Sequence, residues 1–325
     1  MSERTVVVLT AAYNRAGQLK LLFESLCQQT DKVFRWLIVD DGSNDDTKQV
    51  VEKFRLQSNF NITYIYKENG GKHTALNVGL DAVREDIVII EDSDDRLVIN
   101  AIASVKQHWD RHWQDENIGL MLFEYGDLKK KATTPLPRFE RTTRYYQRSH
   151  GFLGDFGEAY RASAIKRYRL PVFKGERFIS EGPLHYEFSK RFDLITVPEV
   201  LSYGEYLPEG LTNNIRKMQV KNPKGTMFEA SLSYGEYLPE GLTNNIRKMQ
   251  VKNPKGTMFE ASLSFGEDTP LKFKLKKAIL FQYVKFHHAE DLGDVDLPRP
   301  PRFINVMATP MAGMLYLKDK VRSEK

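Results

Sequence analysis

The sequence predicts an α/β fold with a mostly parallel sheet and helices on both of its faces. Short apolar runs alternate with helical patterns through the first 125 residues, which is the order of strands joined by crossover helices. The run at residues 87–90, Ile-Val-Ile-Ile, is apolar without interruption, as expected for a strand that is covered on both sides. Crowded carboxylates follow it directly, at the place where open α/β sheets bind their ligands.

Strands and helices are expected in alternation along this part of the chain. The polar stretch after the second strand, DDGSNDDT, has acidic residues that suit the positive N-terminus of the next helix. The turn Asn69-Gly70-Gly71 separates the third strand from its helix. The expected strands are 5–12, 36–39, 62–66, 87–90 and 119–125, and the expected helices are 18–29, one ending at 53, 74–83, 97–113 and the second half of 178–192.

Composition is that of an ordinary globular protein. The chain has 325 residues, of which 41 % are hydrophobic and 28 % charged, and a net charge of +5 that does not indicate a nucleic-acid partner. Cys27 is the single cysteine, which excludes an intrachain disulfide and fits a reducing compartment. Neither a signal-peptide core nor an apolar run of about 18 residues occurs. We expect a cytoplasmic protein, either free or peripheral on the inner face of the cell membrane.

An exact internal repeat is the least ordinary feature of the sequence. Residues 201–231 recur without a change as residues 232–262. Solenoid repeats diverge and need at least about three units, so this pair indicates a recent tandem duplication or an error in the sequence. Only one copy can take the native position. We expect a catalytic domain at 1–200, the duplication at 201–262 and a C-terminal region at 263–325.

Two segments are rich in basic residues. Residues 129–148 contain seven basic residues against one acid and are expected to form a surface loop, either solvated or clamping an anionic group. Residues 271–288 contain five lysines, no acid and apolar residues at helical spacing. They predict a helical extension that either lies on an anionic membrane or packs on the domain.

The carboxylates behind the central strand are the main candidate for chemistry. Asp92 and Asp94 are two residues apart and share a face of an extended backbone. Together they can bind Mg²⁺ or Mn²⁺ while a substrate diphosphate completes the coordination shell. The alternative is a solvated acidic turn.

A second group of polar residues follows the second strand. A buried carboxylate at Asp41 can accept the imide N–H of uracil or thymine, and the competing role is a helix cap. The segment Asn69–Lys72 places flexible backbone and a cation before a helix N-terminus, where anions bind favourably. Lys72 or Arg15 could therefore contact a phosphate, or either could be exposed to solvent.

Four motifs in this order, TAAYNR, IVDDGSNDDT, NGGKHTALNVGL and IIEDSDD, resemble the nucleotide-sugar-binding half of family-2 glycosyltransferases with the GT-A fold. The resemblance covers residues 4–125 and, more weakly, 175–212. It includes the capsule, exopolysaccharide and teichoic-acid types, and it implies a nucleotide-sugar donor. The motif Gln-x-x-Arg-Trp of processive synthases is absent.

The resemblance also implies roles for individual residues. Tyr13 and Asp41 would hold uracil, Asp92 would contact ribose and the diphosphate, and Asp94 with Asp92 would bind the metal. The Glu-Asp pair that carries the family's catalytic base reads Glu181-Gly182 here, so Glu181 is the expected base. A hydroxyl-bearing segment matches Tyr206–Asn213, which the repeat copies, so Thr212 and Thr243 compete for one role. The donor-binding residues implied in this way are Ala11, Tyr13, Arg15, Asp41, Lys72, Asn77, Asp92, Ser93 and Thr212.

The favoured hypothesis is an inverting, metal-dependent enzyme that moves one sugar from a UDP- or dTDP-sugar onto a hydroxyl of a glycan or lipid-linked acceptor. One alternative is a nucleotide-binding variant that the repeat inactivates or switches. Another is a sugar nucleotidyltransferase, although TAAYNRAG is a poor version of the glycine-rich loop that such enzymes carry after the first strand.

Overall fold

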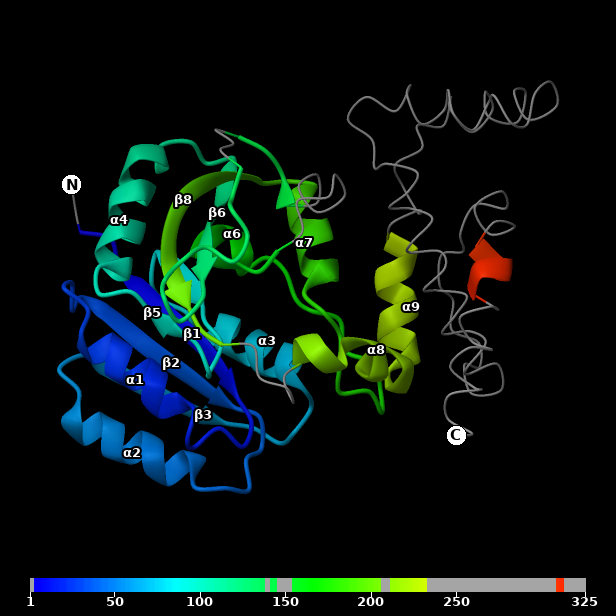
Figure 1. The fold of residues 1–325 in the computed structure, drawn as a ribbon, viewed down its shortest axis with the longest axis horizontal. Coiled ribbons are helices and arrows are strands. Elements are labelled where there is room, and N and C mark those ends of the chain that lie inside the picture. Colours follow the sequence, from blue (N-terminus) through cyan, green and yellow to red (C-terminus); the bar gives the residue numbers. More distant parts are fainter. Residues whose placement is uncertain (1–2, 138–140, 145–153, 206–210, 233–307, 313–325) are drawn as a thin grey trace. The chain divides into compact units, whose positions relative to one another are not determined.

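The computed structural model describes residues 3–137, 141–144, 154–205, 211–232 and 308–312 (Figure 1). The chain divides into two compact units, of which the first comprises residues 1–147 and 152–214 and the second comprises residues 148–151 and 215–325. The named strands all belong to the first unit. The second unit contains α9 (Pro223–Leu232) and most of α8 (Leu211–Lys221).

The first unit is built on an eight-stranded sheet with the strand order β3-β2-β1-β4-β7-β6-β8-β5. The four adjacent strands β3, β2, β1 and β4 all run parallel to one another. Strand β7 is antiparallel to β4 and β6, β8 is parallel to β6, and β5 is antiparallel to β8. The strands are β1 (Val6–Ala12), β2 (Phe34–Asp40), β3 (Asn61–Tyr66), β4 (Ile87–Ile90), β5 (Arg96–Leu97), β6 (Ile118–Gly126), β7 (Phe156–Arg161) and β8 (Asp193–Tyr203).

Helices cover both faces of this sheet, as Figure 1 shows, so the expected α/β class is confirmed. Alternate residues of β1 enter two cores: Val6 and Val8 pack with α1, α2 and α4, whereas Val7 and Leu9 pack with α3 and α7. All four side chains are fully buried, which explains why residues 6–9 are apolar without interruption. The helices of this unit are α1 (Leu19–Cys27), α2 (Thr47–Gln57), α3 (Lys72–Ala82), α4 (Ala101–His112), α6 (Ala162–Ile165) and α7 (Gly182–Ser189).

The sheet departs from the sequence-based expectation after β4. Leu97, expected to be the first residue of a helix, instead forms β5 together with Arg96, because these two residues pair with Ser202 and Tyr203. Strands β7 and β8 were not expected, and β8 crosses residue 200, the expected end of the catalytic domain. The parallel half of the sheet therefore follows the prediction, and the other half is mixed.

The first copy of the repeat takes part in this fold. Its first residues, Leu201–Tyr203, complete β8, and the same copy forms α8 and nearly all of α9. The second copy beyond Leu232, including Thr243, and the basic segment 271–288 lie outside the described residues. Among the helices that the structure describes, none is both long and apolar enough to cross a membrane.

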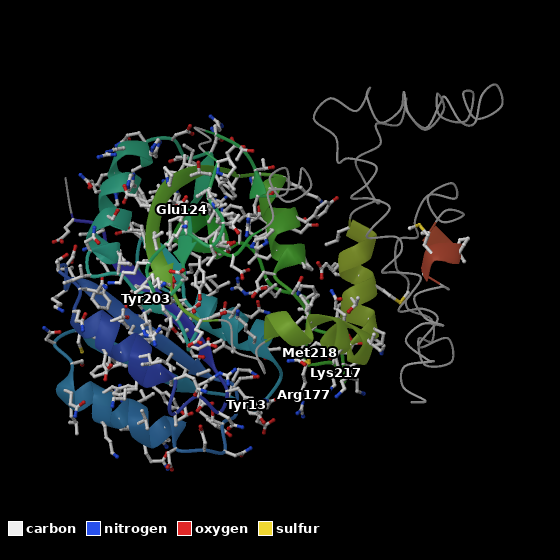
Figure 2. The ribbon with its side chains drawn as sticks, in the orientation of Figure 1. Tyr13, Glu124, Arg177, Tyr203, Lys217 and Met218 are labelled. Carbon is white, nitrogen blue, oxygen red and sulfur yellow. The ribbon has the colours of Figure 1, made fainter. Side chains whose placement is uncertain are left out.

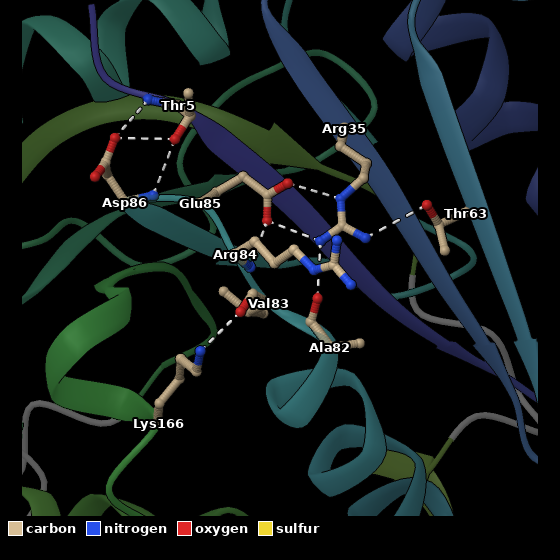
Figure 3. A network of polar contacts seen from close by, with 9 residues as sticks. All are labelled: Thr5, Arg35, Thr63, Ala82, Val83, Arg84, Glu85, Asp86 and Lys166. Carbon is tan, nitrogen blue, oxygen red and sulfur yellow. Dashed lines mark hydrogen bonds and ion pairs between the residues drawn. The ribbon is translucent and has the colours of Figure 1, made fainter. Parts of the chain in front are cut away.

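An ion pair at the edge of the sheet where β2 and β4 begin ties these two strands together (Figure 3). The guanidinium of Arg35 binds both oxygens of Glu85, at 2.7 and 2.8 Å, and also donates to the carbonyl of Ala82 at 3.1 Å. The two side chains are 13 % and 14 % exposed. Burial raises the pKa of Glu85, but the bonds from Arg35 outweigh it and leave the pKa below its usual value.

We predict that Glu85→Gln lowers the free energy of unfolding by about 3 kcal/mol at pH 7, because it leaves a buried guanidinium without its counter-charge. A carboxylate with a depressed pKa stabilises the fold above its unfolded-state pKa, and this stabilisation is lost as the pH falls through the folded-state pKa. Urea unfolding of both forms should therefore give a difference that shrinks below about pH 4.5. A difference that is constant from pH 7 to pH 3 would contradict this account.

Candidate active site

Three parallel strands end at the same edge of the sheet and place their loops side by side. Strand β1 lies between β2 and β4, with Ala12 opposite Asp40 and Leu9 opposite Ile90. The first residue after each outer strand is bonded back to β1: Asp41 N–H donates to Ala12 at 2.8 Å, and Glu91 N–H donates to Leu9 at 3.0 Å. The two acidic motifs are thus on one edge, separated by one strand.

The loop after β1 is fixed to the loop after β2. Asn14 has a positive φ of 52°, and its N–H donates to the Ser43 hydroxyl at 2.8 Å. The N–H of Arg15 donates to the Thr47 hydroxyl at 3.1 Å. Asp45 accepts from Thr47 N–H at 3.0 Å and from Ala16 N–H at 3.1 Å, so it connects the start of α2 with the loop after β1. Tyr13 projects from this loop and is 44 % exposed (Figure 2).

The Asp41 carboxylate is a buried anchor for the glycine turn before α3. One oxygen accepts from Lys67 Nζ at 2.6 Å and from Gly70 N–H at 3.0 Å, and the other accepts from Gly71 N–H at 2.7 Å. Gly71 has a φ of +98°, and a Cβ there would lie 2.0 Å from the carbonyl oxygen of Arg177. Only glycine fits this close approach between the turn and the segment that leads to α7.

Like charges crowd the loop after β4. Burial first, and then the neighbouring carboxylates, raise the pKa of Glu91 well above its usual value and the pKa of Asp95 to about 7. Ser202 donates to Glu91, and the Tyr125 hydroxyl donates to Asp95 at 2.6 Å. Burial and Asp92 also raise the pKa of Asp94, while the charges of Arg15 and Lys72 lower it. The site thus repels further negative charge unless cations offset the repulsion.

Lys72 lies between two carboxylates for which the sequence predicts a role, Asp92 and Glu181. Its Nζ lies 2.7 Å from Asp92 Oδ1 and 3.1 Å from Glu181 Oε1. Burial lowers the pKa of Lys72, but the charges of Asp92 and Glu181 outweigh it and raise the pKa above its usual value. The expected metal-binding motif and the expected base are therefore within reach of one ammonium group.

Glu181 stands at the start of α7. It occupies the N-cap position, and its side chain is 38 % exposed, so solvent or a substrate can reach it. Burial raises the pKa of Glu181, but Lys72 and His185 outweigh this effect and leave the pKa below its usual value. The lowered pKa favours the ionised form of Glu181, which is the form that its expected role as a general base requires.

The structure says less about the roles of the other expected donor-binding residues. The Asn77 amide bonds both backbone groups of Leu170, at 2.8 and 2.9 Å, which gives it a structural contact. Ser93 is 5 % exposed, and Ala11 packs partly buried against the core on the α3 side. Thr212 lies in α8, but its side chain is outside the described part. The donor roles of these residues remain predictions.

Several residues of the site were missed by the sequence analysis. Lys67, which pairs with Asp41, follows β3 and could have been noticed as the polar residue at the end of that strand. Tyr125 and Ser202 reach the acidic loop from β6 and β8, and no pattern in the sequence connects them with it.

The residues present fit a divalent cation only in part. Asp92 and Asp94 offer the oxygen ligands that Mg²⁺ and Mn²⁺ prefer. Among the described residues, no group of three or more His, Cys, Asp or Glu side chains could hold a metal ion by itself. A cation would therefore share its coordination between these two carboxylates and the oxygens of a bound diphosphate or water.

Comparison with known proteins finds similar sequences among glycosyltransferases. The chain is 26 % identical over 177 residues to an uncharacterized glycosyltransferase of Mycoplasma pneumoniae, covering 52 % of this chain and 57 % of that protein. It is 30 % identical over 171 residues to the minor teichoic acid biosynthesis protein GgaA of Bacillus subtilis, covering 49 % of this chain and 37 % of that protein. The chain thus matches only a little over half of these relatives' length, or less.

Solved structures share the fold. The crystal structure of Staphylococcus aureus TarS 1–349 superposes with a TM-score of 0.55 at 17 % identity, covering 97 % of this chain and 92 % of that one. The mannosyltransferase PcManGT of Pyrobaculum calidifontis, in complex with GDP-Man and Mn²⁺, gives a TM-score of 0.51 at 16 % identity, covering 100 % of this chain and 84 % of that one. The likeness confirms the expected GT-A fold. The family model described as glycosyl transferase family 2 matches residues 7–169, about half of the chain, and the chain therefore belongs to glycosyl transferase family 2.

Proposed function

We propose that this protein is an inverting, metal-dependent glycosyltransferase. It moves a single sugar from a UDP- or dTDP-sugar to a hydroxyl of a glycan or lipid-linked acceptor in the synthesis of a cell-surface polysaccharide. The observation that carries the proposal is the shared edge of β2 and β4. With one strand between them, the ends of these strands are about 10 Å apart, which one nucleoside diphosphate can span.

The relatives support the donor class and the type of polymer. TarS has been crystallised in complex with UDP and with UDP-GlcNAc, and its name describes a poly(ribitol-phosphate) β-N-acetylglucosaminyltransferase. GgaA is named for teichoic acid biosynthesis. A donor with a uracil base fits Asp41, because the carboxylate oxygen that binds Gly71 accepts only that one bond within the described residues.

Different residues bind the base, the phosphates and the cation. Tyr13 and Asp41 hold the pyrimidine, and Arg15 and Lys72 contact the phosphates. Asp92 and Asp94 hold the divalent cation, which when bound offsets the negative charge on the diphosphate.

The transfer itself is a single displacement. The acceptor oxygen forms a bond to the anomeric carbon while the bond from that carbon to the diphosphate oxygen breaks on the opposite face. The hydroxyl proton passes to Glu181, and the electron pair of the broken bond stays on the leaving diphosphate. Lys72 lies close enough to Asp92 and Glu181 to stabilise charge at both ends of the displacement.

We predict that Asp94→Asn abolishes metal-dependent transfer and leaves the fold intact, because it removes one of the two carboxylates proposed to bind the cation. The measurement is nucleotide-diphosphate release during a Mn²⁺ titration, with circular dichroism to monitor the fold. Asp81→Asn, at a surface ion pair with Arg169, is the matched control. Undiminished turnover of Asp94→Asn would argue against the metal role.

We predict that Glu181→Gln lowers kcat by about a hundred- to ten-thousand-fold, the usual contribution of a general base. In Lys72→Met, removal of the ammonium group raises the pKa of Glu181, so the acid limb of kcat against pH moves to higher pH. The pH profiles of wild type and Lys72→Met measure this shift. A full rate in Glu181→Gln would mean that another residue is the base. An acid limb of the kcat profile that stays at the same pH in Lys72→Met would exclude control of the pKa of Glu181 by Lys72.

We predict that deletion of residues 232–262 leaves donor turnover within about twofold, because the first copy already completes β8 and because a loop of this length costs little entropy. The donor assay, run on the one-copy and the two-copy chain, tests this. Activity that appears only after the deletion would mean that the repeat inactivates or switches the enzyme.

A further inference from the structure

A carboxylate with several partners lies inside the first unit, beside the candidate active site. Glu158, in the middle of β7, accepts from Arg144 Nε at 3.2 Å and from the Tyr160 hydroxyl at 2.7 Å. His185 Nε2 lies 3.1 and 3.3 Å from its two oxygens. The side chains of Glu158, Arg144 and His185 are 13 %, 5 % and 5 % exposed. Burial raises the pKa of Glu158, but His185 and Arg144 outweigh it and hold the pKa far below its usual value.

Stability alone does not account for this charged group. Glu158 stands on a strand whose neighbours Phe156 and Tyr160 belong to the core on the α3 and α7 side. Taking a carboxylate and a guanidinium out of water costs several kcal/mol per ion, and apolar residues of the same volume often stabilise a fold equally well or better. A buried ionic group at such a place is better explained by the geometry that it specifies.

Glu158 connects the two elements that carry the reactive groups. On the sheet it is paired with Ile90, the last residue of β4, two positions before Asp92. On the helix it holds the side chain of His185, whose backbone N–H donates to the carbonyl of Glu181 at 3.0 Å. The charge of His185 also acts on Glu181, and the charge of Glu181 acts on Tyr160.

We propose that Glu158 is a positioning residue that, through His185, sets the place of the Glu181 carboxylate relative to the strand that carries Asp92 and Asp94. The inference rests on the proposed function, in which Glu181 is the base. In this role Glu158 acts through its contact with His185 and not on the reacting atoms themselves. Its loss lets the first turn of α7 move relative to β4, and the base then stands at the wrong distance from the attacking hydroxyl.

The first test is Glu158→Gln, which keeps the shape but loses the charge that binds Arg144 and His185. A misplacement of about 1 Å costs about a hundredfold in rate, so kcat should fall by about 10- to 100-fold. Donor KM and the Kd of UDP should stay within about threefold, because Asp41 and the Asp92 loop retain their contacts.

The second test is a double-mutant cycle that a merely structural role would not satisfy. In a Glu181→Gln background the base is already gone, so adding Glu158→Gln should cause less than about a threefold further loss of kcat. If Glu158 only stabilises the fold, the two losses multiply, and this outcome would overturn the proposal.

The matched control is Glu85→Gln. It breaks a similarly buried pair with an arginine, but at the end of the sheet where β2 and β4 begin, away from the candidate active site. It should lower the unfolding midpoint without a change in kcat at a temperature where the protein is folded. Equal losses of kcat in Glu85→Gln and Glu158→Gln would contradict the proposal.

Variants of His185 test the same connection if Glu158→Gln does not fold. His185→Gln keeps an N–H donor that can reach Glu158, so its kcat should stay within about fivefold of wild type, whereas His185→Leu should fall like Glu158→Gln. Equal rates in these two variants would refute the role of the His185 contact. Failure of the proposed function looks different: in that case Glu181→Gln keeps its rate, whatever the variants at 158 and 185 do.

Discussion

The repulsion among carboxylates after β4 is the constraint on which the candidate site depends. Burial and mutual repulsion raise the pKa values of Glu91, Asp94 and Asp95, so the loop is costly unless positive charge lies nearby. Lys72 supplies such a charge and binds Glu181 with the same ammonium group. A cation and a diphosphate at Asp92 would compete for these contacts. In the proposed function, donor binding and the ionisation of Glu181 are thus coupled through Lys72.

The rigid surroundings of Lys72 explain how a single lysine can hold two acids. The turn that precedes it is fixed by two backbone bonds to Asp41, which also binds Lys67, and by the close approach of Gly71 to the carbonyl of Arg177. Together these contacts connect the loops after β2 and β3 with the segment that leads to α7. The loop that carries Asp41 and the segment that leads to Glu181 are therefore joined through the same turn, and only glycine at position 71 permits the approach.

Local patterns predicted the first half of the fold and the edge of the sheet at which the two acidic loops lie. The apolar runs of β1, β2 and β4 and the acidic loops after them are short-range signals, and parallel register then places Asp41 and Asp92 on one edge. Strands β7 and β8 were not predicted because they are defined by pairing with distant parts of the chain, such as that of Glu158 with Ile90 and of Tyr203 with Arg96. The same reason hid the contact of Lys72 with Glu181, which are more than 100 residues apart.

The central claim is that one nucleotide spans the two acidic loops. A crystal structure of the protein with UDP and Mn²⁺ tests it most directly. The account predicts the uracil imide within hydrogen-bond distance of Asp41 and the diphosphate, with the cation, at Asp92 and Asp94. Uracil bound away from Asp41, or a diphosphate that does not reach the loop after β4, would contradict it.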